Sequence, residues 1–386
     1  MPTLPEISLL CETDRFGPFR FRIGLDADDL TVPLIRAEDA HRSFAASPLA
    51  QVANRLEREV LVQSVHGTNT IEGAELSEEE TADALSLAPE QVHAEQQARV
   101  RNIKAAYDLA LRRATDPKWS LDLAFIKAVH AEICRDLGDG DNQPGRLRDN
   151  PKDKITYVGD AAHGGRYKPP QFGRDIERLL VGLLEWHGQL VAADIPALIR
   201  APLVHLYFER IHPFWDGNGR VGRVLEATLL RQAGFRYAPF ALSRYYLEQI
   251  HAYFTLFNTA RKADEAGRPF PNQGFIRMHL EGMRLTIDRL HARVNKMVEA
   301  LLFDARLSSL KDAGTINARQ YTIARFVLDR GRPTGYDELR RSPWYMTLYS
   351  KKTDKTRQRD MRGLTTLGLL RVDADGMVRS GFVAAP

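Results

Sequence analysis

The sequence predicts a mainly α-helical fold, and three observations favour this class. Apolar residues recur at helical spacing along most of the chain, for example at 121–133 and 172–190. Strand signals are short, and the clearest of them lies at 154–158. A single long break rich in glycine and proline, residues 138–171, interrupts the helices. We therefore expect helices around one core, with a short hairpin inside the break.

The chain has 386 residues, enough for two or three domains, and its composition is that of a soluble globular protein. We expect an N-terminal helical extension over 1–112 and a helical core over 113–290. A linker helix and a further small module would then occupy 291–386.

Cysteine content and hydropathy exclude several classes of protein. Cys11 and Cys134 are too few and too far apart for a disulfide framework or a zinc site. The start, Met1–Glu6, lacks the basic region and apolar core of a signal peptide. No segment approaches the roughly 18 apolar residues that span a bilayer. We therefore expect a cytoplasmic protein with no membrane partner.

The most informative stretch is residues 211–223, with the sequence IHPFWDGNGRVGR. An apolar helix leads into it from 202, and Pro213 ends that helix. Residues 216–219 then predict a tight turn, since glycine and asparagine adopt left-handed conformations at low cost. A second helix follows at once, from Arg220 to Ala233.

A turn of this kind followed by a helix N-terminus presents unpaired backbone N–H groups to an anion such as phosphate. Asp216 is placed to hold a divalent metal that bridges phosphate oxygens. Arg220 and Arg223 lie one turn apart and can bind further phosphates. His212, beside this turn, is placed to act as a general base. The stretch therefore predicts phosphoryl or nucleotidyl transfer.

The string HPFWDGNGRVGR resembles the signature of the Fic family, HPFx[D/E]GNGRxxR, at every fixed position. The resemblance implies a Fic-type helical core with a β-hairpin flap, and transfer of AMP from ATP to a protein hydroxyl. His212 would be the base, and Asp216 would hold Mg²⁺. The alternative is a capped helix corner with a buried histidine. The nucleotide-binding residues we expect are Phe214, Gly217, Asn218, Gly219, Arg220, Val221, Gly222, Arg223, Tyr253 and Phe254.

Upstream, residues 68–73 read by themselves as the end of a helix, with Gly73 as its cap and a capping box starting at Ser77. Beside the Fic signature, Thr68, Glu72 and Gly73 resemble the family's inhibitory motif, [S/T]xxxE[G/N]. The resemblance implies that Glu72 pairs with Arg223. Such a pair would remove the ligand of the outermost phosphate and place negative charge where that phosphate binds.

The break at 138–171 contains a strand signal at 154–158 and a weaker return strand at 166–168. Residues 145–170 resemble the family's flap, a hairpin that faces the active site. An open hairpin edge can pair with an extended peptide of the target protein. A plain surface hairpin remains the alternative.

Aromatic residues at 243–261 have the spacing of a core helix. The segment also resembles the family helix that closes over the adenine, with Tyr253 and Phe254 as the matching pair, so a site role and a core role both stay open. Arg261 is a weaker candidate for the same pocket. A metal cluster of His205, His212 and Asp216 is conceivable, but packing is the simpler role for His205.

The tail is basic, because residues 315–386 contain 14 Lys and Arg against 7 Asp and Glu. Helical segments followed by a hairpin around 373–376 predict a winged helix-turn-helix. Residues 352–360 resemble the recognition helix of bacterial regulators, and their basic side chains suit DNA phosphates. Winged helices also serve as packing or dimer modules, so homodimerisation through this part is the alternative.

Two classes of function therefore compete. The first is a protein adenylyltransferase that is autoinhibited by Glu72 and modifies a target protein or itself. The second is a DNA-binding regulator that uses the Fic core as a nucleotide sensor. The intact His212, Asp216 and Arg223 favour the enzyme, and the GNGR turn differs from that of the related kinases. The sequence leaves open the target, the modified residue, reversal of the reaction and the oligomeric state.

Overall fold

The structure is a computed structural model, and it describes residues 5–48, 52–137 and 140–381. Parts of three expectations lie outside these ranges: residues 1–4 and 49–51 of the N-terminal extension, residues 138–139 of the break at 138–171, and residues 382–386 of the basic tail. The chain forms two compact units, one of residues 1–46 and 54–290 and one of residues 47–53 and 291–386. The predicted division at 112 stays a prediction.

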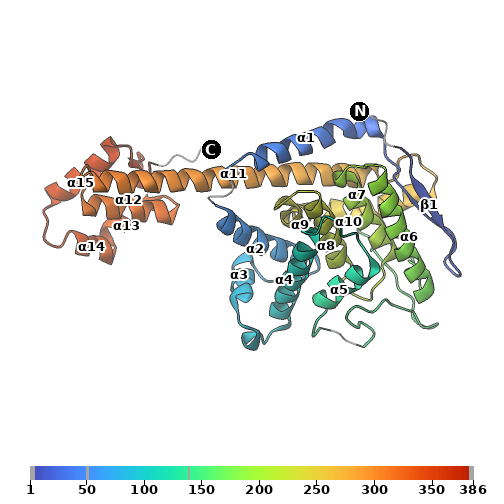
Figure 1. The fold of residues 1–386 in the computed structure, drawn as a ribbon. Helices are drawn as coiled ribbons and strands as arrows, with labels where there is room; N and C mark the ends of the chain where they lie inside the picture. The colour runs from blue at the N-terminus through green and yellow to red at the C-terminus, as the bar shows by residue number, and fades with distance from the viewer. Residues whose placement is uncertain (1–4, 49–51, 138–139, 382–386) are drawn as a thin grey trace. The chain divides into compact units, whose positions relative to one another are not determined.

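The first unit confirms the mainly helical class (Figure 1). Its only sheet in the described residues is a two-stranded antiparallel ribbon, in which Ser8 pairs with Arg22 and Cys11 with Phe19. The elements are β1 (Ser8–Cys11), β2 (Phe19–Arg22), α1 (Ala27–Ala45), α2 (Ala53–Ile71), α3 (Glu78–Ser86), a short 3-10 helix (Pro89–Gln91), α4 (Glu95–Ala114), α5 (Leu123–Ile133), α6 (Gly173–Ala192), α7 (Ala197–Ile211), α8 (Asn218–Gln232), α9 (Ala238–Glu248), α10 (Ile250–Glu265) and the first part of α11 (Gln273–Asp312).

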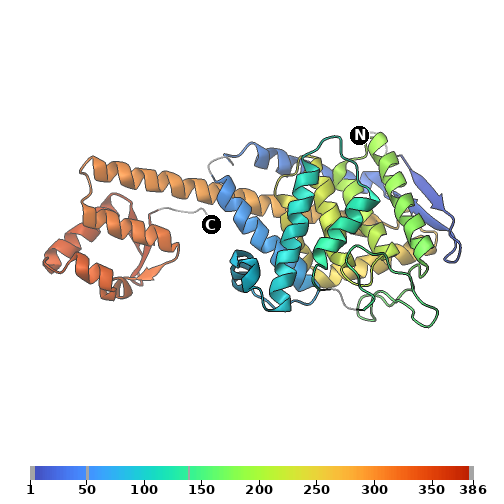
Figure 2. The same cartoon turned by 60° about the horizontal axis from the view of Figure 1, so that its bottom comes forward.

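Helices α7 and α8 form the centre of this unit, and 12 of the 15 residues of each are buried. Helix α8 contacts α4, α5, α7 and α9, and the two ribbon views show it enclosed by these helices (Figures 1 and 2). The turn between α7 and α8 is therefore held by a packed core. Such a support fixes a site more precisely than a free loop does.

Local capping sets the ends of the helices near this turn. Ser77 and Glu80 form the expected capping box at the start of α3. Gly73, with φ of +86°, follows the end of α2, as expected for a C-terminal cap. Asp122 accepts the backbone N–H of Phe125 and so caps α5.

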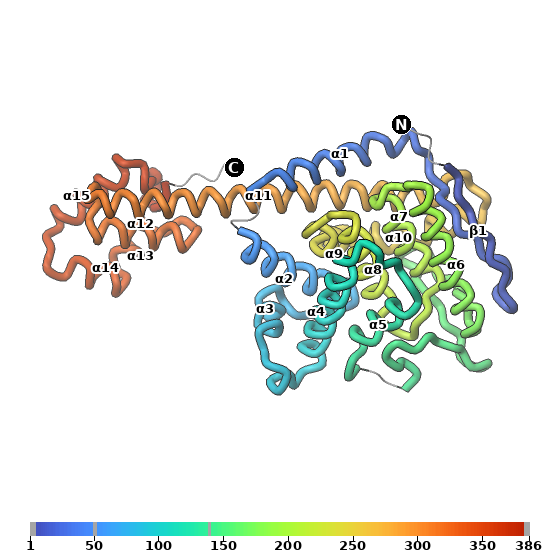
Figure 3. The backbone as a smooth tube through the Cα atoms, in the orientation of Figure 1, coloured from blue at the N-terminus to red at the C-terminus, as the bar shows by residue number. Residues whose placement is uncertain are grey.

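The segment between α5 and α6 contains the predicted flap, and the tube in Figure 3 shows its path. The strand pairing expected at 154–158 and 166–168 is reduced to a single antiparallel bridge, between Val158 and Tyr167. The reason is a contact from outside the strand, because the side-chain amide of Gln171, 15 residues further along, bonds to both the N–H and the carbonyl of Thr156. A side chain thus satisfies backbone groups that a strand would otherwise have paired.

The second unit packs the remaining helices around its own apolar core, which includes Leu307, Ile323, Tyr349 and Leu364. A three-stranded antiparallel sheet has the order β3 (Thr334–Gly335), β5 (Met377–Ser380) and β4 (Leu370–Val372). Assignment of this unit as a winged helix-turn-helix stays a prediction. None of the described helices combines the length and the apolar character that a membrane crossing requires. The elements are the end of α11, α12 (Ala318–Arg330), β3 (Thr334–Gly335), α13 (Tyr336–Arg341), α14 (Pro343–Leu348), α15 (Asp354–Thr366), β4 (Leu370–Val372) and β5 (Met377–Ser380).

Candidate active site

His212 ends α7 in a left-handed conformation, with φ of +51°, and its N–H donates to the carbonyl of Phe208. Its imidazole remains about one-fifth exposed, and Nδ1 lies 3.7 Å from a carboxylate oxygen of Glu209. A positive φ is uncommon for a residue other than glycine and asks for support from its surroundings. The fully buried Arg148 provides that support: its Nε donates to the His212 carbonyl at 2.6 Å, and its backbone N–H to that of Pro213 at 2.9 Å.

The turn after His212 is closed by its own side chains. The Asn218 amide both accepts the N–H of Phe214 and donates to its carbonyl, each at 2.9 Å. Gly217 has φ of +81°, which glycine adopts without strain. The first N–H groups of α8, those of Asn218, Gly219 and Arg220, have no acceptor within their own helix. The turn thus presents backbone donors at a helix N-terminus, as an anion site requires.

Asp216 and Arg220 form an ion pair beside these donors, with Nη2 of Arg220 2.7 Å from Oδ2 of Asp216. Burial would raise the pKa of Asp216, but the guanidinium of Arg220 and the N–H of Gly217 outweigh it and lower the pKa. The carboxylate therefore stays ionised, and more than half of the side chain is exposed. One open carboxylate beside a phosphate site fits Mg²⁺, which usually keeps several waters and takes further ligands from substrate phosphates.

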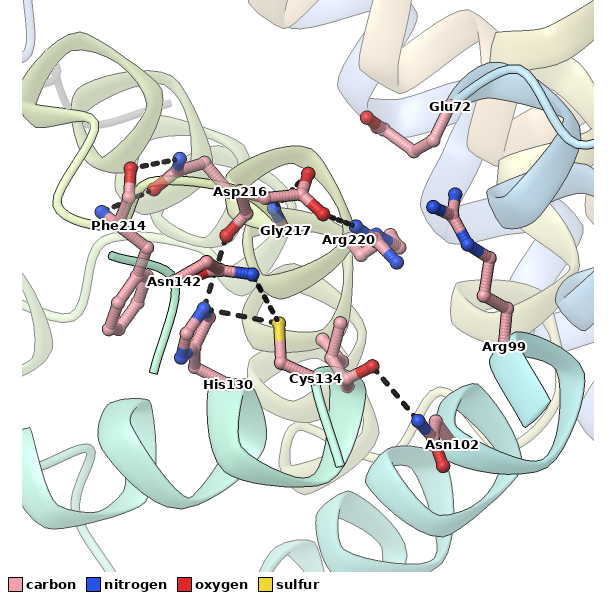
Figure 4. A network of polar contacts seen from close by, with 12 residues as sticks. Glu72, Arg99, Asn102, His130, Cys134, Asn142, Phe214, Asp216, Gly217 and Arg220 are labelled. Atoms are coloured by element: carbon pink, nitrogen blue, oxygen red, sulfur yellow. Dashed lines mark hydrogen bonds and ion pairs between the residues drawn. The ribbon is translucent and has the colours of Figure 1, made fainter. Parts of the chain in front are cut away.

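His130 of α5 holds the turn from below (Figure 4). Its ring stacks on Phe214 with centroids 3.7 Å apart. Nε2 lies 3.1 Å from the carbonyl of Asp216, while Nδ1 accepts the N–H of Gly145 at 2.9 Å. Burial, above all, lowers the pKa of His130 to about 4. The ring is therefore neutral at ordinary pH and joins α5, the start of the flap and the signature turn.

Arg223 is buried one turn after Arg220 on α8, and three residues, Thr68, Glu72 and Tyr253, bond to its guanidinium. Nε donates to the hydroxyl of Thr68 at 2.8 Å, and Nη1 to the hydroxyl of Tyr253 at 3.3 Å. Nη2 donates to Glu72 at 2.6 Å and to the Thr68 carbonyl at 3.2 Å. Burial would lower the pKa of Arg223, but Tyr253 and Glu72 outweigh it and raise the pKa. The arginine is therefore charged in this arrangement.

The carboxylate of Glu72 also reaches the N-terminus of α8. A Cβ on Gly219 would collide with Oε1 of Glu72, so only glycine admits the carboxylate this close. Arg99 of α4 lies on the same side of the site (Figure 4) and adds positive charge there. The Glu72 carboxylate thus occupies the region in which backbone donors and Arg223 would hold an anion.

Comparison with known proteins finds a family match that includes the α7–α8 turn. Residues 120–230 match the model of the Fic/DOC family. The chain carries a Fic domain. It is 26% identical over 240 residues to the protein adenylyltransferase Fic of Aedes aegypti, covering 61% of this chain and 44% of the relative. It is 27% identical over 226 residues to the protein adenylyltransferase fic-1 of Caenorhabditis elegans, covering 53% and 40%. The chain thus spans less than half the length of these relatives.

Solved structures share the fold of the Fic domain. A Fic family protein from Desulfovibrio desulfuricans G20 superposes with a TM-score of 0.55 at 17% identity, over 90% of this chain and 95% of that one. A Fic domain containing signaling protein from Bacteroides thetaiotaomicron has a TM-score of 0.56 at 16% identity, over 68% and 97%. At these identities, the likeness concerns the fold.

Not every expected residue of the Fic domain faces the turn. Val221 is fully buried, and its N–H donates to the carbonyl of Gly217. Neither the side chain nor the N–H group of Val221 is therefore free for a ligand. Gly222 faces α7, because a Cβ there would lie 2.6 Å from the ring of His205. Val221 is therefore a core residue, and Gly222 lets α8 approach α7 closely.

The aromatic pair of α10 divides between core and surface. Tyr253 is buried and reaches Arg223, while Phe254 is half-buried and edge-on to His163 of the flap, with centroids 5.4 Å apart. Arg261 also turns to the flap and lies over the ring of Tyr167. His205 bonds to Glu226, and the described residues hold no group of three metal-ligating side chains.

The sequence did not single out Arg148 as a support of the turn, nor did it show a partner for His130.

Proposed function

We propose that this protein is a protein adenylyltransferase that moves AMP from ATP to a hydroxyl side chain of a target protein or of itself. The observation that carries the proposal is the intact constellation of His212, Asp216 and Arg223 around the N-terminus of α8. A protein that only senses nucleotide has no need of the base. The names of the relatives from Aedes aegypti and Caenorhabditis elegans support the same activity.

In the proposed reaction, the target hydroxyl attacks the α-phosphorus of ATP, the bond from that phosphorus to the bridging oxygen breaks, and pyrophosphate leaves. His212 takes the hydroxyl proton. Since Nδ1 faces Glu209, we assign Nε2 as the accepting nitrogen. The donors of residues 218–220 would hold phosphate oxygens, and Arg223 the outermost phosphate. Mg²⁺, held by Asp216, would neutralise phosphate charge.

We propose that Glu72 holds this activity back. Its carboxylate accepts from Nη2 of Arg223 and lies against Gly219. In this position it leaves no room for a second anion at the N-terminus of α8. ATP would then bind with its outer phosphate displaced and its α-phosphorus misaligned. Errors of about 1 Å in the position of reacting atoms cost on the order of a hundredfold in rate.

We further propose that the target docks on the flap, residues 145–170. Two large apolar side chains there, Ile155 and Tyr157, are each about half exposed, and only one bridge pairs the segment internally. Both features suit an added extended peptide. Homodimerisation and a cytoplasmic location belong to the same proposal and rest on the sequence.

A regulator that binds DNA is the second candidate, and the charge of α15 favours it. Lys355 and Arg359 are exposed on this helix, beside Lys351 and Lys352 in the preceding turn. Basic side chains on an exposed helix suit the phosphates of duplex DNA.

Label transfer tests the activity directly. ATP labelled on the α-phosphate should label the protein or a target in a lysate, while ATP labelled on the γ-phosphate should not. Transfer of the γ-label alone would indicate a kinase and overturn the proposal. Mass spectrometry of the labelled peptide then identifies the modified hydroxyl.

A further inference from the structure

A directed chain of hydrogen bonds runs beneath Arg223 into the core. Nη1 of Arg223 donates to the hydroxyl of Tyr253 at 3.3 Å. That hydroxyl lies 3.1 Å from Nε2 of His205, and Nδ1 of His205 lies 3.0 Å from Oε2 of Glu226. All four side chains are buried, so water does not substitute for these partners.

The direction of the chain follows from its two ends. Arg223 can only donate, so the hydroxyl oxygen of Tyr253 accepts from it. The ionised Glu226 can only accept, so His205 donates from Nδ1 and, when neutral, accepts at Nε2. The hydroxyl hydrogen of Tyr253 therefore points to His205. Every donor and acceptor along the chain is used in this arrangement.

Glu226 anchors the chain at its inner end. The hydroxyl of Tyr246 donates to it at 3.0 Å, and Nδ1 of His279 lies 2.8 Å away. Burial would raise the pKa of Glu226, but His279 and His205 outweigh it and lower the pKa. A carboxylate with three donors, on the same helix as Arg223, gives the chain a fixed end.

We propose that Tyr253 and His205 are positioning residues that hold Arg223 in the geometry for the outermost phosphate of ATP. The inference rests on the proposed function, and it gives Tyr253 a role different from stacking on the nucleobase. Tyr253 is only 1% exposed, and its hydroxyl is committed to Arg223 and His205. When ATP displaces Glu72, Nη2 turns to the phosphate while Tyr253 keeps Nη1 in place.

The hydroxyl of Tyr253 is the only acceptor that Nη1 has within the described residues. Tyr253→Phe removes that oxygen and leaves a buried donor of Arg223 and a buried acceptor of His205 without partners. The guanidinium then relaxes toward other acceptors. Because only ATP has a third phosphate, the weakening should fall on ATP and spare ADP.

The test measures the Kd of ATP and of ADP by calorimetry in a Glu72→Gly/His212→Ala protein, which frees Arg223 and stops turnover. Adding Tyr253→Phe should raise the Kd of ATP about tenfold and that of ADP less than twofold. His205→Leu should act in the same way, and His205→Gln, which retains a polar acceptor, should restore part of the ATP affinity.

Tyr207→Phe is the matched control. Tyr207 is equally buried, and its hydroxyl bonds to the backbone of Arg22 and to Asn272 rather than to this chain. It should lower Tm without changing the ratio of the two affinities. Equal weakening of ATP and ADP binding in Tyr253→Phe, or none, would overturn the positioning role. Failure of the parent protein to bind ATP would instead overturn the proposed function, and this inference with it.

Discussion

The carboxylate of Glu72 lies 2.6 Å from Nη2 of Arg223, although 151 residues separate the two in sequence. The contact joins the end of α2 to the helix that follows the signature turn. Thr68 adds two further hydrogen bonds to the same guanidinium from within α2. Helix α2 and the residue that follows it thus accept three of the four hydrogen bonds of this guanidinium, and Tyr253 of α10 accepts the fourth.

Removal of the base should stop the chemistry without preventing nucleotide binding. We expect His212→Ala, made in the Glu72→Gly protein, to reduce AMP transfer by a factor of about 100 to 10,000. The backbone donors of α8 and both arginines remain, so the Kd of ATP should change little. The measurement is self-modification with α-labelled ATP beside calorimetry. Transfer at the parent rate would rule out His212 as base.

Acid should destabilise the first unit through buried histidines. Burial, aided by Arg200, lowers the pKa of His187 to about 4, so the unfolded chain takes up a proton near pH 6.5 that the folded chain refuses. The contribution of His187 to the free energy of unfolding should therefore be at its maximum above pH 6.5. It should be lost as the pH falls from 6.5 to 4, which lowers the free energy of unfolding by on the order of 2–3 kcal/mol.

Urea unfolding at several pH values measures this effect. His187→Leu should show a shallower decline below pH 6.5 than the wild type, because its unfolded state no longer gains that proton. The side chain is buried on α6, a helix that carries none of the candidate-site residues. Parallel pH profiles of the two proteins would show that His187 titrates normally in the folded state.

Substitutions in the basic helix α15 test whether the second unit binds DNA or serves as a packing or dimerisation module. If it binds duplex DNA, affinity should fall steeply with salt as counterions are released. Neutralising Lys355, Arg357 and Arg359 together should flatten the slope, by up to about one unit for each phosphate that is no longer neutralised. Fluorescence anisotropy with a labelled duplex measures both quantities. Absence of binding at low salt would leave this unit as a packing or dimerisation module.

The features that the sequence predicts correctly are those that depend on residues close together in the chain. The helical class, the cap at Gly73 and the capping box at Ser77 depend on neighbouring residues, and the structure has all three. The turn around Gly217 is likewise a local matter of left-handed conformations.

Contacts between distant residues were harder to foresee. Arg148 supports His212 across 64 residues, and His130 meets the carbonyl of Asp216 across 86. Neither spacing has a periodic signature. Tyr253 belongs to an aromatic helix whose pattern fits core and site equally, and only packing brings its hydroxyl to Arg223. The strand expected at 154–158 does not form, because the side-chain amide of Gln171, 15 residues from Thr156, bonds to the N–H and the carbonyl of that residue.

The most direct test of the central claim is the rate of self-modification with α-labelled ATP in Glu72→Gly, compared with wild type. Deleting the carboxylate frees Arg223 and the space beside Gly219, so we predict a gain of about tenfold or more, since misplacement by about 1 Å costs about two decades. Glu72→Asp should lie between the two, and adding Arg223→Ala should abolish the gain. An unchanged rate in Glu72→Gly would contradict the account and leave residues 68–73 as an ordinary helix end.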